Sequence, residues 1–158
     1  MFVGHQVLLN VGFGVARARL AGLVHDGLLV IASREAYGNA VTGLSLGCPP
    51  GWVPGLSKVV QVQARDLVIR EGSALLTVRW QATGPGDALF PVLDADIRLI
   101  PARERGTVLR LDGAYRPPPS ITGDRLDRVV LHRVATATAQ DFLGRIAEAV
   151  ADPVKLRG

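Results

Sequence analysis

The sequence predicts an α+β fold in which a curled antiparallel sheet wraps around one long C-terminal helix, with short helices after the first strand. Residues 58–115 alternate between apolar and polar side chains, as strands do when only one face of a sheet is covered. Residues from about 122 to 150 repeat apolar side chains at helical spacing. The elements do not alternate as βαβ units, so a parallel Rossmann-type sheet is not expected.

The N-terminal part is predicted to form a strand, two short helices and a further strand. Residues 5–11 are apolar and compatible with a strand, and residues 14–23 contain good helix formers. Residues 25–37 fit a second short helix, although their LLVIAS segment also fits a strand. Residues 37–46 alternate loosely and are predicted to form a strand. Residues 48–54 (CPPGWVP) are rich in proline and are predicted to form a loop.

The run Gly12-Phe13-Gly14 follows an apolar segment, as the opening of a phosphate-binding turn does. A dinucleotide-binding G-x-G-x-x-G motif requires a third glycine at position 17, where this chain has Arg17. That third glycine allows close packing of helix and strand, which a long charged side chain prevents. We therefore expect the two glycines to bend the chain from the first strand into the first helix rather than to bind a nucleotide.

Four strands joined by short turns are predicted to form an antiparallel meander, at residues 58–69, 74–83, 90–100 and 107–115. Their alternation predicts a buried face made of Leu76, Val78, Trp80, Ala82, Leu93, Ala95, Ile97, Leu99, Leu109 and Leu111. The opposite face carries acids and arginines. We expect Asp96 to pair across strands with Arg79 or Arg110, because such pairs stabilise a wet sheet face.

The composition predicts a single globular domain spanning residues 1–158. Hydrophobic residues make up 48% of the chain, and no apolar stretch reaches the roughly 20 residues of a transmembrane helix. The N-terminus lacks the features of a signal peptide. A single cysteine excludes an internal disulfide and a cysteine-based metal cluster, so a cytoplasmic setting fits best. No cofactor and no metal are expected, since His5 and His25 lack metal-ligand spacing.

The formal net charge of +4 is compatible with binding to nucleic acid. The arginines are spread along the chain, however, and alternate with apolar residues instead of forming a basic run. We interpret them as a solvated surface and expect no nucleic-acid partner.

The element order and three stretches resemble the START-like superfamily, also called SRPBCC or polyketide cyclase/dehydratase-like, in an actinobacterial-type branch. The stretches are RWQATGPGDALFPVLDADIRL (79–99), LDGAYRPPP (111–119) and LDRVVLHRVATATAQDFLGRIA (126–147). The resemblance covers nearly the whole chain and implies the helix-grip fold. It also implies a hydrophobic small-molecule ligand, such as a lipid, sterol or polyketide, held between helix and sheet. Some members are aromatase/cyclases, but no catalytic residue of theirs maps onto this chain by motif.

Simple geometry also favours a cavity in such a fold. A single helix is about 10 Å across and cannot fill a wide curled sheet. The chain has few bulky fillers, with 5% aromatic residues and one methionine. An apolar pocket with few polar groups is the usual form of a ligand site. The residues expected to line it are Trp80, Trp52, Tyr37, Tyr115, Leu93, Val134 and Thr138.

Several of these residues also have a purely structural interpretation. Trp80 is either core or pocket wall, and Trp52 either lies at the pocket mouth or caps the core. The hydroxyls of Tyr37 and Tyr115 either orient a ligand or bond a backbone carbonyl. His132 is the one weak candidate for a general base, and the alternative is a histidine on the helix surface.

Three functions therefore remain open. The first is binding of a hydrophobic or amphipathic small molecule, and the second is a cyclase/dehydratase-type enzyme that uses the same cavity. The third is a protein-interaction module that uses the apolar sheet edge or the loop around Trp52. An empty, collapsed pocket with a large apolar dimer interface would favour this third function, and a homodimer is one expected partner. Asp94 and Asp96 are expected to form salt bridges on the charged face rather than a catalytic pair. A His132 side chain on the outer face of the helix would count against the enzyme.

Overall fold

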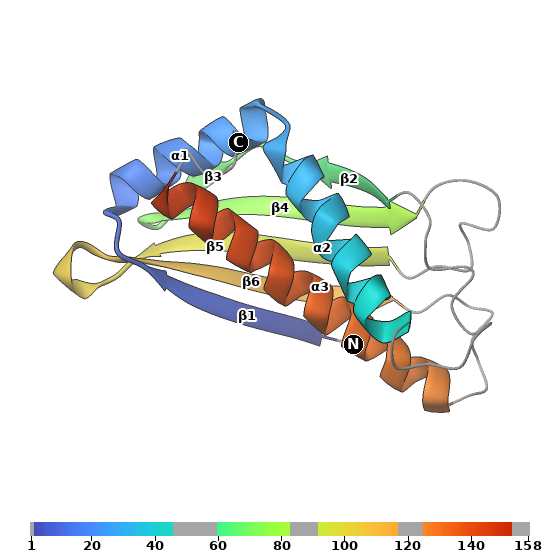
Figure 1. The fold of residues 1–158 in the computed structure, drawn as a ribbon. Helices are drawn as coiled ribbons and strands as arrows, with labels where there is room; N and C mark the ends of the chain where they lie inside the picture. The colour runs from blue at the N-terminus through green and yellow to red at the C-terminus, as the bar shows by residue number, and fades with distance from the viewer. Residues whose placement is uncertain (1, 46–59, 83–91, 117–124, 153–158) are drawn as a thin grey trace.

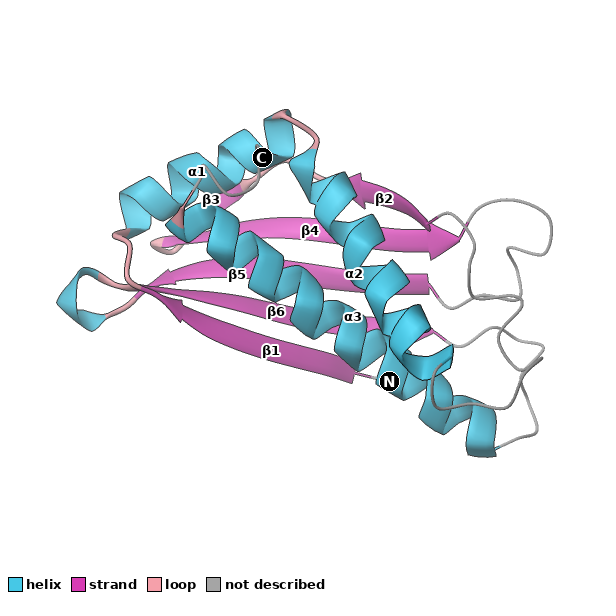
Figure 2. Ribbon diagram, viewed as in Figure 1, coloured by secondary structure: helices cyan, strands magenta, loops and turns pink. Residues whose placement is uncertain are grey.

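The computed structural model describes residues 2–45, 60–82, 92–116 and 125–152 (Figure 1). Its elements are β1 (Phe2–Leu9), α1 (Phe13–His25), α2 (Leu28–Ser45), β2 (Val60–Ala64), β3 (Val68–Arg70), β4 (Ser73–Ala82), β5 (Val92–Pro101), a 3₁₀ turn (Arg103–Arg105), β6 (Thr107–Arg116) and α3 (Arg125–Ala151). The strands form one antiparallel sheet in the order β1-β6-β5-β4-β2, and β3 also pairs with β4. All three helices cover the same face of this sheet (Figure 2). The chain thus has the predicted α+β helix-grip fold.

The central strands β4, β5 and β6 follow the predicted alternation. Their inward side chains are buried: Leu76, Val78, Trp80, Leu93, Ala95, Ile97, Leu99, Leu109, Leu111 and Tyr115. The turn between β3 and β4 uses Glu71 and Gly72, which both have positive φ angles of 48° and 76°. The short turn predicted between the strands at residues 58–69 and 74–83 is therefore confirmed, and it sets the register of the hairpin.

The charge pairing on the solvent-facing side of the sheet differs from the prediction. Asp96 lies opposite Thr77 and accepts a hydrogen bond of 2.8 Å from its hydroxyl. Arg79 lies opposite Asp94 instead, at 3.7 Å. Arg110 contacts Asp112 on its own strand at 2.8 Å. Acids and arginines do pair on this face, but the predicted Asp96 partners were wrong. The register places Arg79 opposite Asp94 and Arg110 opposite Arg98, and Arg110 pairs with Asp112 of its own strand.

The segment predicted as one strand over residues 58–69 forms two short strands, β2 and β3. Ala64 pairs with Val78 and Val68 pairs with Leu75. The three residues 65–67 therefore lie opposite the two residues 76–77 of β4. This extra residue is a β-bulge, which bends a strand and shifts its alternation. As a result Val62 is buried, whereas Val68 and Ile69 are 45% and 53% exposed.

The helix α1 begins directly after Gly12, which is its extended N-cap. The hydroxyl of Thr107 on β6 donates to the carbonyl oxygen of Val11 at 2.7 Å and ties this junction to the sheet. The glycines therefore connect the first strand to the first helix, as predicted. The connection leaves Arg17 on the exposed side of α1.

The strand predicted at residues 37–46 was wrong, because α2 continues through Ser45 and is not short. Its buried residues Leu29, Ala32, Ser33 and Ala36 recur at helical spacing, and α2 packs on α3. The small side chains at positions 32 and 36 permit a close helix–helix approach. The packing of α2 on α3 therefore decides the secondary structure of this segment, although its apolar residues alternate loosely as in a strand.

The long helix α3 carries the predicted apolar stripe. Val134, Ala135, Thr138, Phe142, Ile146 and Val150 are all buried. Figure 1 shows α3 crossing the sheet diagonally, with α2 beside it. None of the helices in the described residues is long and apolar enough to cross a membrane.

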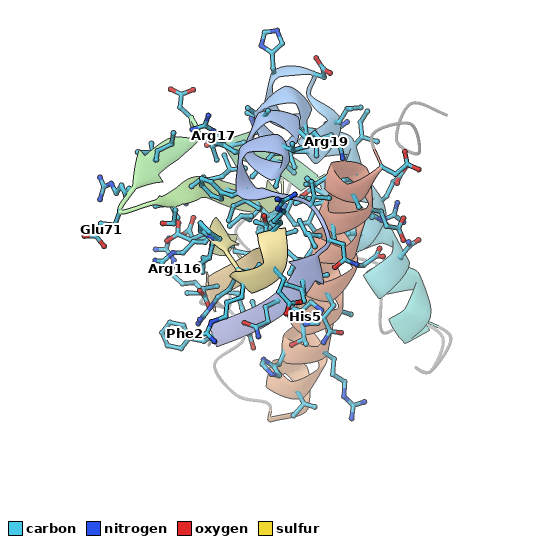
Figure 3. All side chains as sticks on the ribbon, turned by 90° about the vertical axis from the view of Figure 1, so that its left-hand side faces the viewer. Phe2, His5, Arg17, Arg19, Glu71 and Arg116 are labelled. Carbon is cyan, nitrogen blue, oxygen red and sulfur yellow. The ribbon has the colours of Figure 1, made fainter. Side chains whose placement is uncertain are left out.

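The C-terminal end of α3 is capped by Arg19 of α1. Its guanidinium donates to the carbonyl oxygens of Val150 at 2.7 Å and Ala151 at 3.0 Å (Figure 3 labels this side chain). The last carbonyls of a helix have no partners within the helix, and a cation there also interacts favourably with the helix dipole. Arg19 therefore joins the first helix to the last one.

Replacing Arg19 with methionine is expected to lower the free energy of unfolding by about 1–2 kcal/mol, because both carbonyls lose a charged donor. Chemical denaturation measures this change. The matched control is Arg17→Met on the exposed side of the same helix, which should stay within about 0.5 kcal/mol of the parent. Equal losses in both variants would contradict the capping role.

Candidate functional site

A row of large side chains crosses the inner face of the sheet near one end. Trp80 lies directly opposite Leu93, and Leu93 lies directly opposite Tyr115. All three are buried, with exposed fractions of 4%, 6% and 1%. Val62 extends the row to β2, where it lies opposite Trp80. Three of the predicted ligand-lining residues are therefore direct neighbours on adjacent strands.

The helix α3 lies over this row and touches it at two places. The rings of Phe142 and Trp80 meet edge to face, with their centroids 4.9 Å apart and an interplanar angle of 85°. The rings of His132 and Tyr115 have centroids 6.0 Å apart. Val134 and Thr138 lie on α3 between these two contacts and are buried. The predicted residues from the sheet and from α3 are thus all buried, and Trp80 contacts α3 through Phe142.

The helix α2 contacts the same row through Trp80. The indole N–H of Trp80 donates a hydrogen bond to the Ser33 hydroxyl oxygen, and Ser33 is fully buried. Tyr37 follows Ser33 by one helical turn and packs against the same core. Ser33 was not among the predicted site residues. Nothing in the apolar sequence around it indicates a role until its contact with Trp80 is known.

Burial changes the ionisation of both tyrosines. It raises the pKa of Tyr37 from 10.0 to about 12 and also raises the pKa of Tyr115. Removing a phenolate from water disfavours its charged form. Both side chains therefore stay protonated well above neutral pH, and each can donate a hydrogen bond.

A spectroscopic titration of tyrosinate absorbance tests this environment. We expect little tyrosinate at pH 10, since these are the only two tyrosines of the chain and both have raised pKa values. Because the folded pKa of Tyr37 exceeds the unfolded one, the free energy of unfolding should fall as the pH rises from about 10 to about 12. The Tyr37→Phe variant should show a smaller fall. Half-maximal absorbance at pH 10 in the folded protein would contradict the burial of these groups.

Two hydroxyl oxygens on α3 are buried without a hydrogen-bond partner, those of Thr136 and Thr138. The Thr138 side chain is of particular interest because only 4% of it is exposed and it lies between the two ring contacts of α3. Leaving a buried hydroxyl unpaired costs about 1–3 kcal/mol. Buried polar atoms are nearly always paired, so an unpaired one indicates a place for a water molecule or a ligand group.

The remaining candidates are His132, Asp94, Asp96 and Trp52. The side chain of His132 is exposed to solvent, although its ring lies near that of Tyr115. Asp94 and Asp96 lie on the solvent-facing side of the sheet, where Arg116 and Thr77 contact them. Trp52 and its loop fall outside the described residues. Within those residues, no three potential ligands from histidine, cysteine, aspartate and glutamate gather as a metal site.

The face of the sheet opposite the helices is hollowed at two places that described residues line. One hollow has a volume of about 400 Å³ and lies over β1, β4, β5 and β6. The other has about 240 Å³ and lies over β2, β4 and β5. Both are bordered by Asp94, whose carboxylate is already paired with Arg79 and Arg116. None of the described residues of α3 lines either hollow.

No protein-family model matches this chain, and no curated protein sequence matches it either. Among solved structures, a hypothetical protein of Helicobacter pylori is 10% identical, with a TM-score of 0.48 over 92% of this chain and 87% of that one. A conserved protein of Geobacillus kaustophilus is 14% identical, with a TM-score of 0.47 over 94% and 97% of the two chains. The Zhui aromatase/cyclase of a Streptomyces species is 13% identical, with a TM-score of 0.34 over 97% of each chain. Similarity at this level assigns neither a family nor an activity.

Proposed function

We propose that this protein binds one apolar or amphipathic small molecule between α3 and the row formed by Trp80, Leu93 and Tyr115. The observation that supports this most is the buried Thr138 hydroxyl, which has no hydrogen-bond partner and belongs to the same stripe of α3 that contacts the row. A ligand with a carbonyl or hydroxyl group satisfies it. The resemblance to START-like proteins points to the same class of ligand.

The surrounding residues have complementary roles in this proposal. The apolar walls supply most of the affinity, at roughly 25 cal/mol for each Å² of apolar surface removed from water. The Thr138 hydroxyl orients the polar end of the ligand. Trp80 is held in place by Ser33 and Phe142, so it forms a fixed wall rather than a movable gate.

A cyclase-type enzyme is the alternative use of the same space. It requires a titratable group directed at the ligand, and His132 was the only candidate. Its exposed position counts against this alternative. Ligand binding without turnover is therefore the function that we favour.

The variant Thr138→Val is expected to separate stability from binding. Valine has nearly the same shape and lacks the unpaired hydroxyl, so the free energy of unfolding should rise by about 1 kcal/mol. The affinity for a bound probe should fall by roughly 5- to 10-fold, because one hydrogen bond is lost. Denaturation measures the first change. Fluorescence titration with cis-parinarate and with a hydroxyanthraquinone measures the second.

The matched control is Thr77→Val on the opposite face of the sheet. Its hydroxyl donates to Asp96 at 2.8 Å, so its loss should lower stability by about 1 kcal/mol and leave probe binding unchanged. Binding of neither probe to the parent protein would contradict the proposed function. Equal effects of the two substitutions on probe affinity would contradict the assignment of Thr138 to the site.

A further inference from the structure

The two edges of the sheet differ in how they are protected. At one edge, β2 and β3 are short, with 5 and 3 residues, and a bulge separates them. At the other edge, β1 runs for 8 residues in continuous register with β6, from Phe2 opposite Ala114 to Leu9 opposite Thr107. Its sequence FVGHQVLL contains no proline and no aspartate, glutamate, lysine or arginine. Natural sheets protect exposed edges with such residues, with bulges or with short strands, and β1 has none of these.

The edge strand β1 also carries the two most exposed large apolar side chains in the described residues. Phe2 is 84% exposed and Leu8 is 64% exposed. Both lie on the face away from the helices, and Figure 3 shows Phe2 pointing to that side while His5 lies on the side of α3. Odd-numbered residues of β1 face inward, and Val3 and Leu9 are buried. Among the described residues no strand lies beyond β1, so an unpaired backbone edge and an apolar outer face coincide on one strand.

We propose that β1 pairs antiparallel with β1 of a second copy of this chain, which joins the two sheets across a two-fold axis. Directly opposite residues of an antiparallel pair share a face, so even-numbered residues must meet even-numbered ones. The register centred on His5 satisfies this rule. It places Phe2 of each copy opposite Leu8 of the other, Val3 opposite Val7, and Gly4 opposite Gln6.

The sequence of β1 favours a second copy over a different partner. A two-fold axis brings each residue near the axis close to its own counterpart, so a permanently charged residue there would meet a like charge. β1 contains no aspartate, glutamate, lysine or arginine. It therefore has no charge that would repel a second copy or attract a partner of opposite charge. The register centred on His5 also covers both exposed apolar side chains of each copy, because Phe2 of one copy contacts Leu8 of the other. This interface lies at the sheet edge and does not depend on the ligand site proposed above.

Sedimentation velocity over a range of concentrations tests the interface. We expect the parent protein to approach twice the mass of one chain. The Gln6→Lys variant places two lysines on one face at diagonal positions, about 7–8 Å apart, and should raise the dissociation constant at least 10-fold. The matched control is Ile69→Lys, at an exposed position of the opposite edge, which should leave the mass distribution unchanged. A parent that remains monomeric, or equal dissociation by both variants, would overturn the proposal.

Cysteine cross-linking then tests the register. In a Cys48→Ser background, which removes the only native cysteine, chains carrying Phe2→Cys are mixed with chains carrying Leu8→Cys. Mild oxidation should give cross-linked dimers in the mixture and very few with either variant alone. Cross-linking of Phe2→Cys chains to each other, or none in the mixture, would contradict the register centred on His5.

Discussion

Replacing Phe142 with alanine is expected to lower the free energy of unfolding by about 3–5 kcal/mol. Phe142 is fully buried and its ring meets Trp80 edge to face, so it attaches α3 to the inner face of the sheet. The truncation removes buried apolar surface, leaves a cavity and also loses the specific ring contact. Urea denaturation followed by circular dichroism measures the change.

The control for this prediction is Val129→Ala on the same helix. Val129 is 50% exposed, and its truncation should alter stability by less than about 0.5 kcal/mol. If Phe142→Ala cost less than about 1 kcal/mol, the ring contact would not be the attachment of α3 that the structure indicates.

The second large effect is expected at Gly113 in β6, where a side chain has no room. A β-carbon there would lie 3.2 Å from the β-carbon of Ala95, 3.2 Å from Val3 Cγ2 and 3.3 Å from Leu93 Cδ1. These neighbours belong to strands on both sides of Gly113, so they cannot all move away at low cost. Gly113→Ala should therefore lower the free energy of unfolding by about 1–3 kcal/mol.

The same substitution at Gly144 should have the opposite sign. No atom lies within 4 Å of the β-carbon position of Gly144, and the residue is inside α3. Alanine there should raise stability by roughly 0.5–1 kcal/mol, because glycine loses more backbone freedom in a helix. A shift of stability in the same direction in both variants would contradict the explanation that crowding around the β-carbon position requires glycine at position 113.

The parts of the fold that were predicted correctly follow a simple periodicity. The sequence predicted which side chains of β4, β5 and β6 face the core and which residues of α3 form its apolar stripe. In these elements apolar residues lie on the buried side and polar residues lie on the exposed side. The errors arose where periodicity was weak or interrupted. Loose alternation in residues 37–46 concealed the second half of a helix that packs on α3. The bulge after Ala64 reversed the alternation of residues 68–70.

Several of the residues predicted to line a site are buried neighbours on the inner face of the sheet, but their geometry could not be predicted from the sequence. Parity placed Trp80 and Leu93 on one face, but only the strand register made Leu93 a neighbour of both Trp80 and Tyr115. Ser33 was missed because its role depends on a contact with Trp80, which is distant in sequence. The unpaired state of the Thr138 hydroxyl is likewise a property of packing that no sequence pattern shows.

Native mass spectrometry of the purified protein tests the central claim, a ligand site between α3 and the sheet. The parent protein is measured alone and with palmitate, a sterol and a hydroxyanthraquinone, beside the variant Thr138→Leu, which fills the proposed space. Its unfolding transition is recorded to establish that it is folded. We expect the parent to bind one equivalent of at least one of these compounds, and Thr138→Leu to bind at least 10-fold less. No complex with the parent, or equal occupancy in the parent and the folded variant, would contradict the claim.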